Sequence, residues 1–149
     1  MPAPIPAPLV ERLLDSWPIA RLATLAEAGR PHLVPIVFAW HGGALWSPID
    51  GKPKASTPLA RVRNVERDPR AAVLLDRYTG DWKRLWWIRI DGRAEVMRGS
   101  GAADPLRAKY PQYRDVPLFR AEPTWLRVAP ERTASWYASE AVLDELLAS

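Results

Sequence analysis

The residues best suited to chemistry lie between positions 52 and 64, where cations gather around a proline. Lys52-Pro53-Lys54 holds two of the four lysines, after a predicted strand and before a predicted helix. Arg61 and Asn64 are three residues apart and share one face of that helix, whereas Arg63 points to a different side. With the N–H groups of the helix N-terminus, these donors suit a phosphate group. Ordinary solvated surface cations are the alternative, and the pattern alone leaves both open.

Large aromatic side chains follow the cations. Trp86 and Trp87 are adjacent, so in a strand they face opposite sides of the sheet, and one can fill a core while the other lines a pocket or an interface. Trp82 and Trp46 are further candidates for ring contacts among eight tryptophans. Core packing is the alternative for any single tryptophan. Cations followed by flat rings fit a ligand with a phosphate at one end and a planar ring at the other, such as a flavin or deazaflavin.

Other chemistries have little support in the sequence. The chain has no cysteine, which excludes disulfides, thiol chemistry and cysteine-ligated metals. His32 and His41 are the only histidines, so we predict no metal site. The G-x-S-x-G pattern of a serine hydrolase is missing. His32 and Tyr78 are weak candidates for an acid or base, and the catalytic residue stays unassigned. The net charge of +4 comes from basic residues that alternate with acids, so we expect no nucleic-acid partner.

Apolar periodicity predicts the elements that must position these residues. Helices are expected over residues 9–17, 57–67, 102–109 and 140–148, the second capped by Thr57 with Pro58 following and the last capped by Ser139. Strands are expected over residues 19–26, 31–40, 44–50, 70–78 and 85–98, with a last strand or strand pair over 124–129 and 133–138. His41-Gly42-Gly43 predicts a hairpin turn, and Asp91-Gly92 a bulge. Consecutive hairpins without regular strand–helix alternation favour an antiparallel barrel or an α+β fold of about six strands.

The domain organisation is expected to be simple. Residues 9–149 are long enough for one domain with a core of its own. The proline-rich residues 1–8 predict a flexible arm, too poor in apolar residues for a signal peptide or a membrane helix. No other stretch is apolar enough to span a bilayer, so a cytoplasmic protein without a membrane partner is expected.

Several segments resemble the pyridoxamine 5′-phosphate oxidase-like, split β-barrel superfamily. Arg21-Leu22-Ala23-Thr24-Leu25 and Gly29-Arg30-Pro31-His32-Leu33-Val34-Pro35-Ile36 resemble its opening hairpin. Other segments look like the actinobacterial branch that uses the deazaflavin coenzyme F-420 in place of FMN. These are Asp50-Gly51-Lys52-Pro53-Lys54, Leu59-Ala60-Arg61-Val62-Arg63-Asn64, Asp68-Pro69-Arg70 and Asp81-Trp82-Lys83-Arg84-Leu85-Trp86-Trp87-Ile88-Arg89. The resemblance covers about residues 10–140, and the lysine and tryptophan segments are its most specific part.

This resemblance implies a mostly β fold with short helices, a six-stranded antiparallel split β-barrel. It also implies a homodimer with two equivalent cofactor sites at the subunit interface. The strand over residues 34–38, with Pro35 and Ile36, would run beside the ring system of the cofactor. The phosphate would be held by Ser47, Pro48, Ile49, Lys52, Lys54 and Arg61, with Arg63 and Asn64 nearby. Trp86 or Trp87 would reach the site of the other subunit.

The implied activity is hydride transfer between coenzyme F-420 and a small organic acceptor. In such an oxidoreductase the protein binds, orients and excludes water. FMN is the alternative cofactor, because it also joins a phosphate to a tricyclic ring. A non-catalytic flavin- or deazaflavin-binding protein is the alternative function, because a fold does not fix an activity. The chain has no convincing R-x-H-like motif near its C-terminus, which speaks against oxidation of pyridoxine phosphate.

Overall fold

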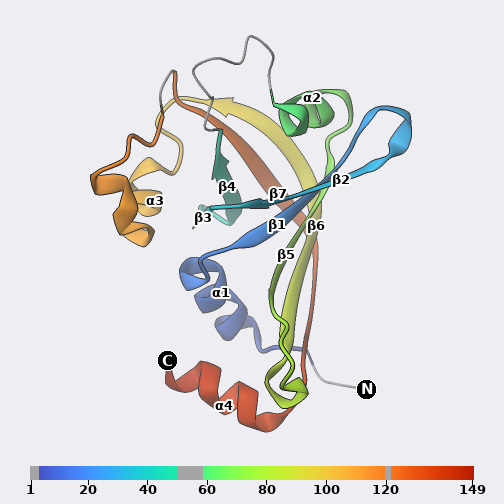
Figure 1. Ribbon diagram of the computed structural model, residues 1–149, viewed down its shortest axis with the longest axis vertical. Coiled ribbons are helices and arrows are strands. Elements are labelled where there is room, and N and C mark those ends of the chain that lie inside the picture. Colours follow the sequence, from blue (N-terminus) through green and yellow to red (C-terminus); the bar gives the residue numbers. More distant parts are fainter. Residues whose placement is uncertain (1–3, 50–58, 120–121) are drawn as a thin grey trace.

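One antiparallel sheet dominates the computed structural model of this chain, which describes residues 4–49, 59–119 and 122–149 (Figure 1). Its strands are β1 (Ala20–Leu25), β2 (Pro31–Ile36), β3 (Ala39–His41), β4 (Ala44–Pro48), β5 (Arg70–Arg77), β6 (Trp86–Arg98) and β7 (Thr124–Tyr137). The helices are α1 (Ala7–Ser16), α2 (Ala60–Arg67), α3 (Ala103–Lys109) and α4 (Glu140–Ala148). Short 3-10 turns lie at η1 (Glu27–Gly29), η2 (Trp82–Arg84) and η3 (Pro111–Arg114).

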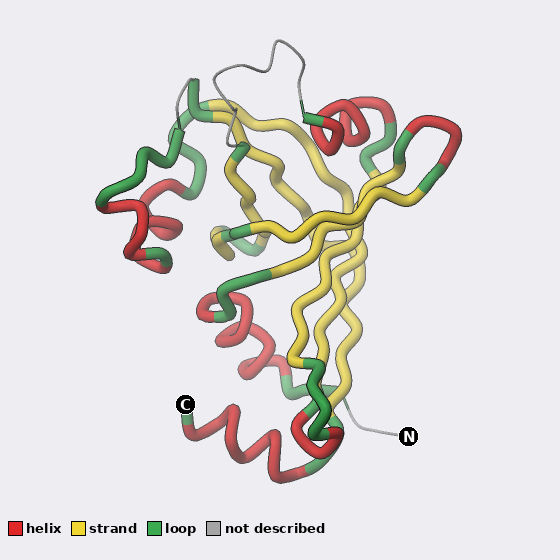
Figure 2. Tube along the Cα trace, in the orientation of Figure 1, coloured by secondary structure: helices red, strands yellow, loops and turns green. Residues whose placement is uncertain are grey.

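The mostly β architecture with short helices is confirmed, but two details of the expected barrel were wrong. The described strands number seven instead of six, and they hydrogen-bond in the order β2-β1-β5-β6-β7-β4-β3. β2 and β3 therefore lie at the two ends of the sheet, which the described strands do not close into a barrel. The sheet is strongly curved, so its two halves run in different directions (Figure 2).

The additional strand arises because the segment expected as one strand over residues 31–40 is interrupted at Val37 and Phe38. The Val37 carbonyl accepts a hydrogen bond from the Ser47 hydroxyl, and the Phe38 N–H donates to the Tyr110 hydroxyl. These backbone groups are thus paired with side chains and not with a neighbouring strand, so β2 ends at Ile36 and β3 begins at Ala39.

Local turn chemistry was predicted more accurately. Gly42 and Gly43 both have positive φ, at 60° and 73°, and join β3 to β4 in a two-residue hairpin. The bulge expected at Asp91-Gly92 is confirmed as a register shift between β6 and β7. Asp91 pairs with Arg132 and Gly92 with Pro130, which leaves Glu131 on β7 as the additional residue.

Two hydrophobic cores lie on opposite faces of the sheet. The larger one packs α1, α2 and α4 against inward-facing strand residues, among them the fully buried Leu22, Ile88 and Trp86. The smaller one lies under α3, where Trp125 contacts both Trp46 and Phe119 edge to face. α3 thus covers the second face only around β3 and the adjoining parts of β4, β6 and β7.

The N-terminal segment is more ordered than predicted within its described part. We expected a flexible arm through residue 8, but α1 begins at Ala7 and Ile5 is buried in the larger core. The Ile5 N–H donates to the Ser135 hydroxyl on β7 at 2.9 Å. No helix in residues 4–49, 59–119 and 122–149 is long and apolar enough to cross a membrane.

Candidate functional site

The residues predicted around the cations fall into an undescribed and a described part. Lys52 and Lys54 lie outside the described residues, as do the expected cap Thr57 and Pro58. α2 is described from Ala60, and its N-cap Leu59 supplies no side-chain cap. On this helix Arg61 is half-buried and Arg63 is exposed, so their guanidinium groups differ in access to solvent.

Asn64, on the same helix, is tied into the protein interior. It is buried, and its side-chain amide donates to the Thr24 hydroxyl of β1 at 3.0 Å. Its carbonyl oxygen accepts from Arg67, which also donates to the Leu25 carbonyl. Asn64 therefore docks α2 on β1. This contact places Arg61 and Arg63 near the C-terminal end of β1.

The predicted residues on β4 and β2 lie at a different place. The Ser47 side chain is buried and donates to the Val37 carbonyl at 2.9 Å, which brings β4 beside the end of β2. Pro48 is buried as well, and the Ile49 N–H continues the pairing with β7 by donating to the Thr124 carbonyl at 2.9 Å. Ile36 is buried, whereas Pro35 is exposed on the opposite face of β2.

The adjacent tryptophans separate across the sheet as expected for a strand. Trp86 has no exposed surface and packs edge to face on Trp17, with ring centroids 4.7 Å apart. Its indole N–H has no hydrogen-bond partner in the described residues. Trp87 is half-buried on the other face, where the Arg89 guanidinium lies 5.8 Å from its ring centroid. Trp87 alone is thus placed where a ligand or a second chain can reach it.

The face that carries Trp87 and Pro35 continues across five strands. The pairing puts Pro35 opposite Arg21, Arg21 opposite Leu74, and Leu74 opposite Arg89. We call this surface the open face; its apolar members are Ala23, Leu33, Pro35, Ala72, Leu74, Trp87, Ala134 and Trp136. Leu33 is 67% exposed, and in the described part of the chain no helix covers this side of the lower sheet (Figure 2). Ion pairs from Arg21 to Asp76 and from Arg132 to Asp91 lie among these side chains.

The described predicted residues therefore do not form one pocket within one chain. Pro35 and Trp87 belong to the open face, whereas the side chains of Ile36, Ser47, Asn64 and Trp86 point to the larger core or its border. The guanidinium groups of Arg61 and Arg63 lie on α2, near one end of the sheet, and the apolar side chains of the open face lie on its uncovered surface. Cations suit a phosphate and apolar rings suit a planar ring system, so this donor set fits a flavin-type ligand in part. Within residues 4–49, 59–119 and 122–149, no group of three histidine, aspartate or glutamate side chains could hold a metal ion.

Two residues missed by the sequence reasoning hold the interruption between β2 and β3. Lys109 donates to the Phe38 carbonyl at 3.1 Å, and burial lowers its pKa to about 7. The Tyr110 hydroxyl accepts from the Phe38 N–H and donates to the Pro18 carbonyl, and burial raises its pKa to about 12. A lysine and a tyrosine at the end of a short helix carry no local signal for this role, because their partners are distant in sequence.

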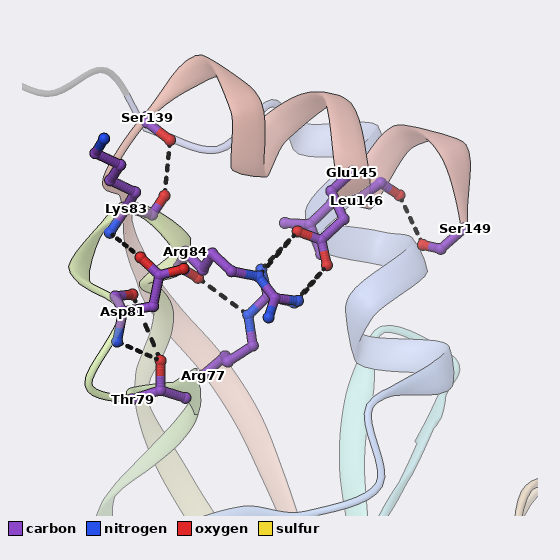
Figure 3. Close-up of polar contacts among 9 residues, drawn as sticks. All are labelled: Arg77, Thr79, Asp81, Lys83, Arg84, Ser139, Glu145, Leu146 and Ser149. Atoms are coloured by element: carbon purple, nitrogen blue, oxygen red, sulfur yellow. Dashed lines mark hydrogen bonds and ion pairs between the residues drawn. The ribbon is translucent and has the colours of Figure 1, made fainter.

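A second polar cluster fastens α4 to the hairpin between β5 and β6 (Figure 3). Glu145 accepts hydrogen bonds from both Arg77 and Arg84. These bonds, with the larger effect from Arg84, lower the pKa of the Glu145 carboxyl to about 2. Ser139 is the N-cap residue of α4 as expected, but its hydroxyl donates to the Lys83 carbonyl at 2.7 Å and makes no side-chain cap hydrogen bond. These contacts close no site; they anchor the C-terminal helix.

Comparison with known proteins gives a family and a fold. The sequence profile of the family described as pyridoxamine 5′-phosphate oxidase matches residues 7–137. No curated protein sequence matches the chain.

Three solved structures illustrate the fold. The conserved hypothetical protein Rv2991 from Mycobacterium tuberculosis has a TM-score of 0.71 and 21% identity, over 91% of this chain and 87% of that one. An FAD-binding protein from Mesorhizobium loti has a TM-score of 0.67 and 20% identity, over 92% and 98%. An F420 reductase has a TM-score of 0.59 and 22% identity, over 83% and 94%.

Proposed function

The chain belongs to the pyridoxamine 5′-phosphate oxidase family, and from this membership we propose that it is an oxidoreductase that uses a flavin-type cofactor. The family match over residues 7–137 carries the proposal, and the open face with Trp87 and Pro35 supports it. One solved structure of the same fold is an FAD-binding protein and another is an F420 reductase, which agrees with this cofactor class.

The residues of this chain have separate tasks in the proposal. The cofactor supplies hydride transfer when bound, and the protein binds, orients and shields it. Arg61 and Arg63, with Lys52 and Lys54 from the preceding segment, are the proposed phosphate donors. Pro35 and Trp87 are proposed to flank the ring system on the open face. Ser47 and Asn64 act behind the ligand, because their side chains hold β2 to β4 and α2 to β1.

We propose a homodimer in which two open faces meet and enclose the cofactor. A sheet face that carries Leu33, Leu74, Trp87 and Trp136 among paired charges, with no helix over it in the described residues, is suited to an interface. The predicted site residues are also spread over both faces of the sheet, so a single chain leaves the ring side open. A second copy would cover the ring and exclude water from it.

Coenzyme F-420 is the proposed cofactor, and FMN is the alternative. The preference for F-420 rests on the resemblance of Lys52-Pro53-Lys54 and of the Trp82 to Trp87 segment to the deazaflavin-dependent branch. The test is a titration of purified protein with each cofactor, followed by quenching of tryptophan fluorescence. We expect F-420 to bind at the lower concentration. Tight FMN binding without F-420 binding would contradict the choice of cofactor.

Substitution of the lysines tests the phosphate end of the same site. Lys52→Ala and Lys54→Ala should each weaken F-420 binding by about 1–3 kcal/mol, because each removes a charge-assisted contact to an anion. Arg114→Ala is a control that removes the same charge, since Arg114 is exposed in η3, outside the segments that carry the resemblance to the deazaflavin-dependent branch. Equal binding by all three variants and the wild type would remove these lysines from the site.

Catalysis needs a separate measurement, because a cofactor-binding protein without activity is the competing function. Reduced F-420 should be reoxidised by an enone, quinone or nitroaromatic acceptor faster with the protein than without it. If F-420 binds but no acceptor in a broad panel is reduced, the protein is a binder and not an enzyme.

A further inference from the structure

The chain between β2 and β3 is fixed by three side chains at two consecutive residues. Ser47 donates to the Val37 carbonyl at 2.9 Å, Tyr110 accepts from the Phe38 N–H at 3.2 Å, and Lys109 donates to the Phe38 carbonyl at 3.1 Å. Phe38 itself has no exposed surface. Its N–H and C=O, which would otherwise be unpaired in the interior, thus depend on neighbouring residues of α3 and its C-cap.

We call Val37 and Phe38, which join β2 to β3, the turn. Lys109 and Tyr110 also connect this turn to the end of α1. The Lys109 Nζ lies 3.4 Å from the centroid of the Phe38 ring and 3.5 Å from the Leu14 carbonyl oxygen. The Tyr110 hydroxyl donates to the Pro18 carbonyl at 2.7 Å. Together they join three segments that are far apart in sequence, so the course of the chain from Ile36 into β3 depends on their contacts.

The charge of Lys109 changes near neutral pH. Burial lowers its pKa to about 7, whereas the negative charge of Asp15 on α1 acts in the opposite direction and raises it. The other titratable group at this contact is Tyr110, which burial holds as a neutral phenol up to about pH 12. The turn itself contributes only the Phe38 ring and backbone. An ammonium group is a better partner than a neutral amine for an aromatic face and for carbonyl oxygens.

We propose that Lys109 and Tyr110 are positioning residues for the cofactor-binding strand, and that protonation of Lys109 tightens cofactor binding. This rests on the proposed function, in which β2 lies beside the cofactor. Pro35 and Ile36 of β2 directly precede the turn, and Ser47 is bonded to it. In the protonated state the turn is held firmly and β2 is ordered for its ligand. Loss of the proton loosens the turn, and part of the binding free energy is then used to order it.

The dissociation constant for coenzyme F-420 should be measured by fluorescence between pH 6 and pH 8.5. At each pH, the dissociation constant of the wild type is divided by that of Lys109→Met. We expect this ratio to rise roughly 3- to 10-fold from pH 6 to pH 8.5. This ratio cancels titration of the cofactor and of other residues. Lys109→Arg should retain tight binding at both pH values, because its charge persists. Parallel pH profiles for the wild type and Lys109→Met would overturn the proposal.

Tyr110→Phe gives a different signature. It retains the ring beside Lys109 but leaves the Phe38 N–H without an acceptor. We therefore expect weaker binding at every pH, with the pH dependence of the wild type preserved. Unchanged binding by Tyr110→Phe would remove Tyr110 from the proposed role.

Measurements without cofactor separate failure of this proposal from failure of the proposed function. Hydrogen exchange of the Phe38 amide should be faster in Tyr110→Phe and in Lys109→Met than in the wild type at matched pH. The Lys109 side chain should titrate near pH 7 by NMR, and bound cofactor should raise that midpoint by linkage. If no cofactor binds but these exchange and titration results hold, only the proposed function fails. If Phe38 exchange is unchanged, the proposed role of Lys109 and Tyr110 in fixing the backbone at Phe38 is contradicted.

Discussion

Gly92 shows at the scale of one residue how the absence of a side chain sets the path of a strand. A Cβ atom at this position would lie 2.3 Å from the Ala129 carbonyl oxygen and 3.1 Å from its carbon, both backbone atoms of the paired strand. We expect Gly92→Ala to lower the free energy of unfolding by about 1–3 kcal/mol, because backbone atoms cannot move aside without disturbing the bulge. Urea denaturation measures the difference.

Gly80→Ala is the matched control for this prediction. A Cβ atom at Gly80 would meet no atom within 4 Å. Its substitution should therefore change the free energy of unfolding by less than about 0.5 kcal/mol. Equal destabilisation by the two substitutions would show that the contact with Ala129 does not determine the choice of glycine at position 92.

At the scale of elements, the features that depend on neighbouring residues were predictable from the sequence. The Gly42-Gly43 hairpin, the Gly92 bulge and the limits of α4 follow from local turn chemistry and apolar periodicity. The break between β2 and β3 was not predictable, since its hydrogen bonds come from Lys109 and Tyr110, about 70 residues away. An uninterrupted apolar run gives no sign that a distant hydroxyl will replace a strand partner.

The candidate site shows the same division between local and distant information. That Trp86 and Trp87 face opposite sides of the sheet follows from strand alternation and is observed. Which of them enters the core depends on the position of α1, because Trp86 packs on Trp17. Likewise, nothing in the sequence near Ser47 or Asn64 indicates that their polar groups are used by Val37 and Thr24. These assignments need the tertiary structure.

The C-terminal helix α4 offers a test at the element scale. Glu145 is bonded to Arg84 and Arg77, which hold the pKa of its carboxyl near 2, below its ordinary value of 4.5. Since the folded-state pKa is the lower one, the stabilisation is present above about pH 4.5 and is lost as the pH falls toward 2. We expect Glu145→Gln to speed hydrogen exchange of the α4 amides at pH 7, with the wild type approaching the variant in acid.

Asp144→Asn provides the control on the same helix. Asp144 is exposed, and substitution there removes one negative charge without touching the Glu145 contacts. Its exchange rates should stay close to those of the wild type across the pH range. If Asp144→Asn and Glu145→Gln behave alike, general charge on α4 and not the arginine contacts holds the helix in place.

At the scale of the whole molecule, the open face is the surface on which the proposed assembly depends. Leu33 is 67% exposed on β2, and it shares that face with Ala23 and Ala72 in the neighbouring strands. Leu33→Glu should not disturb the folded monomer, because the side chain is already largely in water. In a dimer that buries this face it would place an unpaired charge in an apolar contact, which is strongly unfavourable.

We therefore expect light scattering at micromolar concentration to give a dimer mass for the wild type and a monomer mass for Leu33→Glu. Leu147→Glu is the control, because Leu147 is 52% exposed on α4, on the other side of the sheet, and this variant should remain dimeric. Coenzyme F-420 binding should weaken together with dimerisation in Leu33→Glu and persist in Leu147→Glu. A monomeric wild type, or a Leu33→Glu variant that is still dimeric, would exclude the open face as the subunit interface. Loss of the dimer with unchanged F-420 affinity would place the cofactor site entirely within one chain.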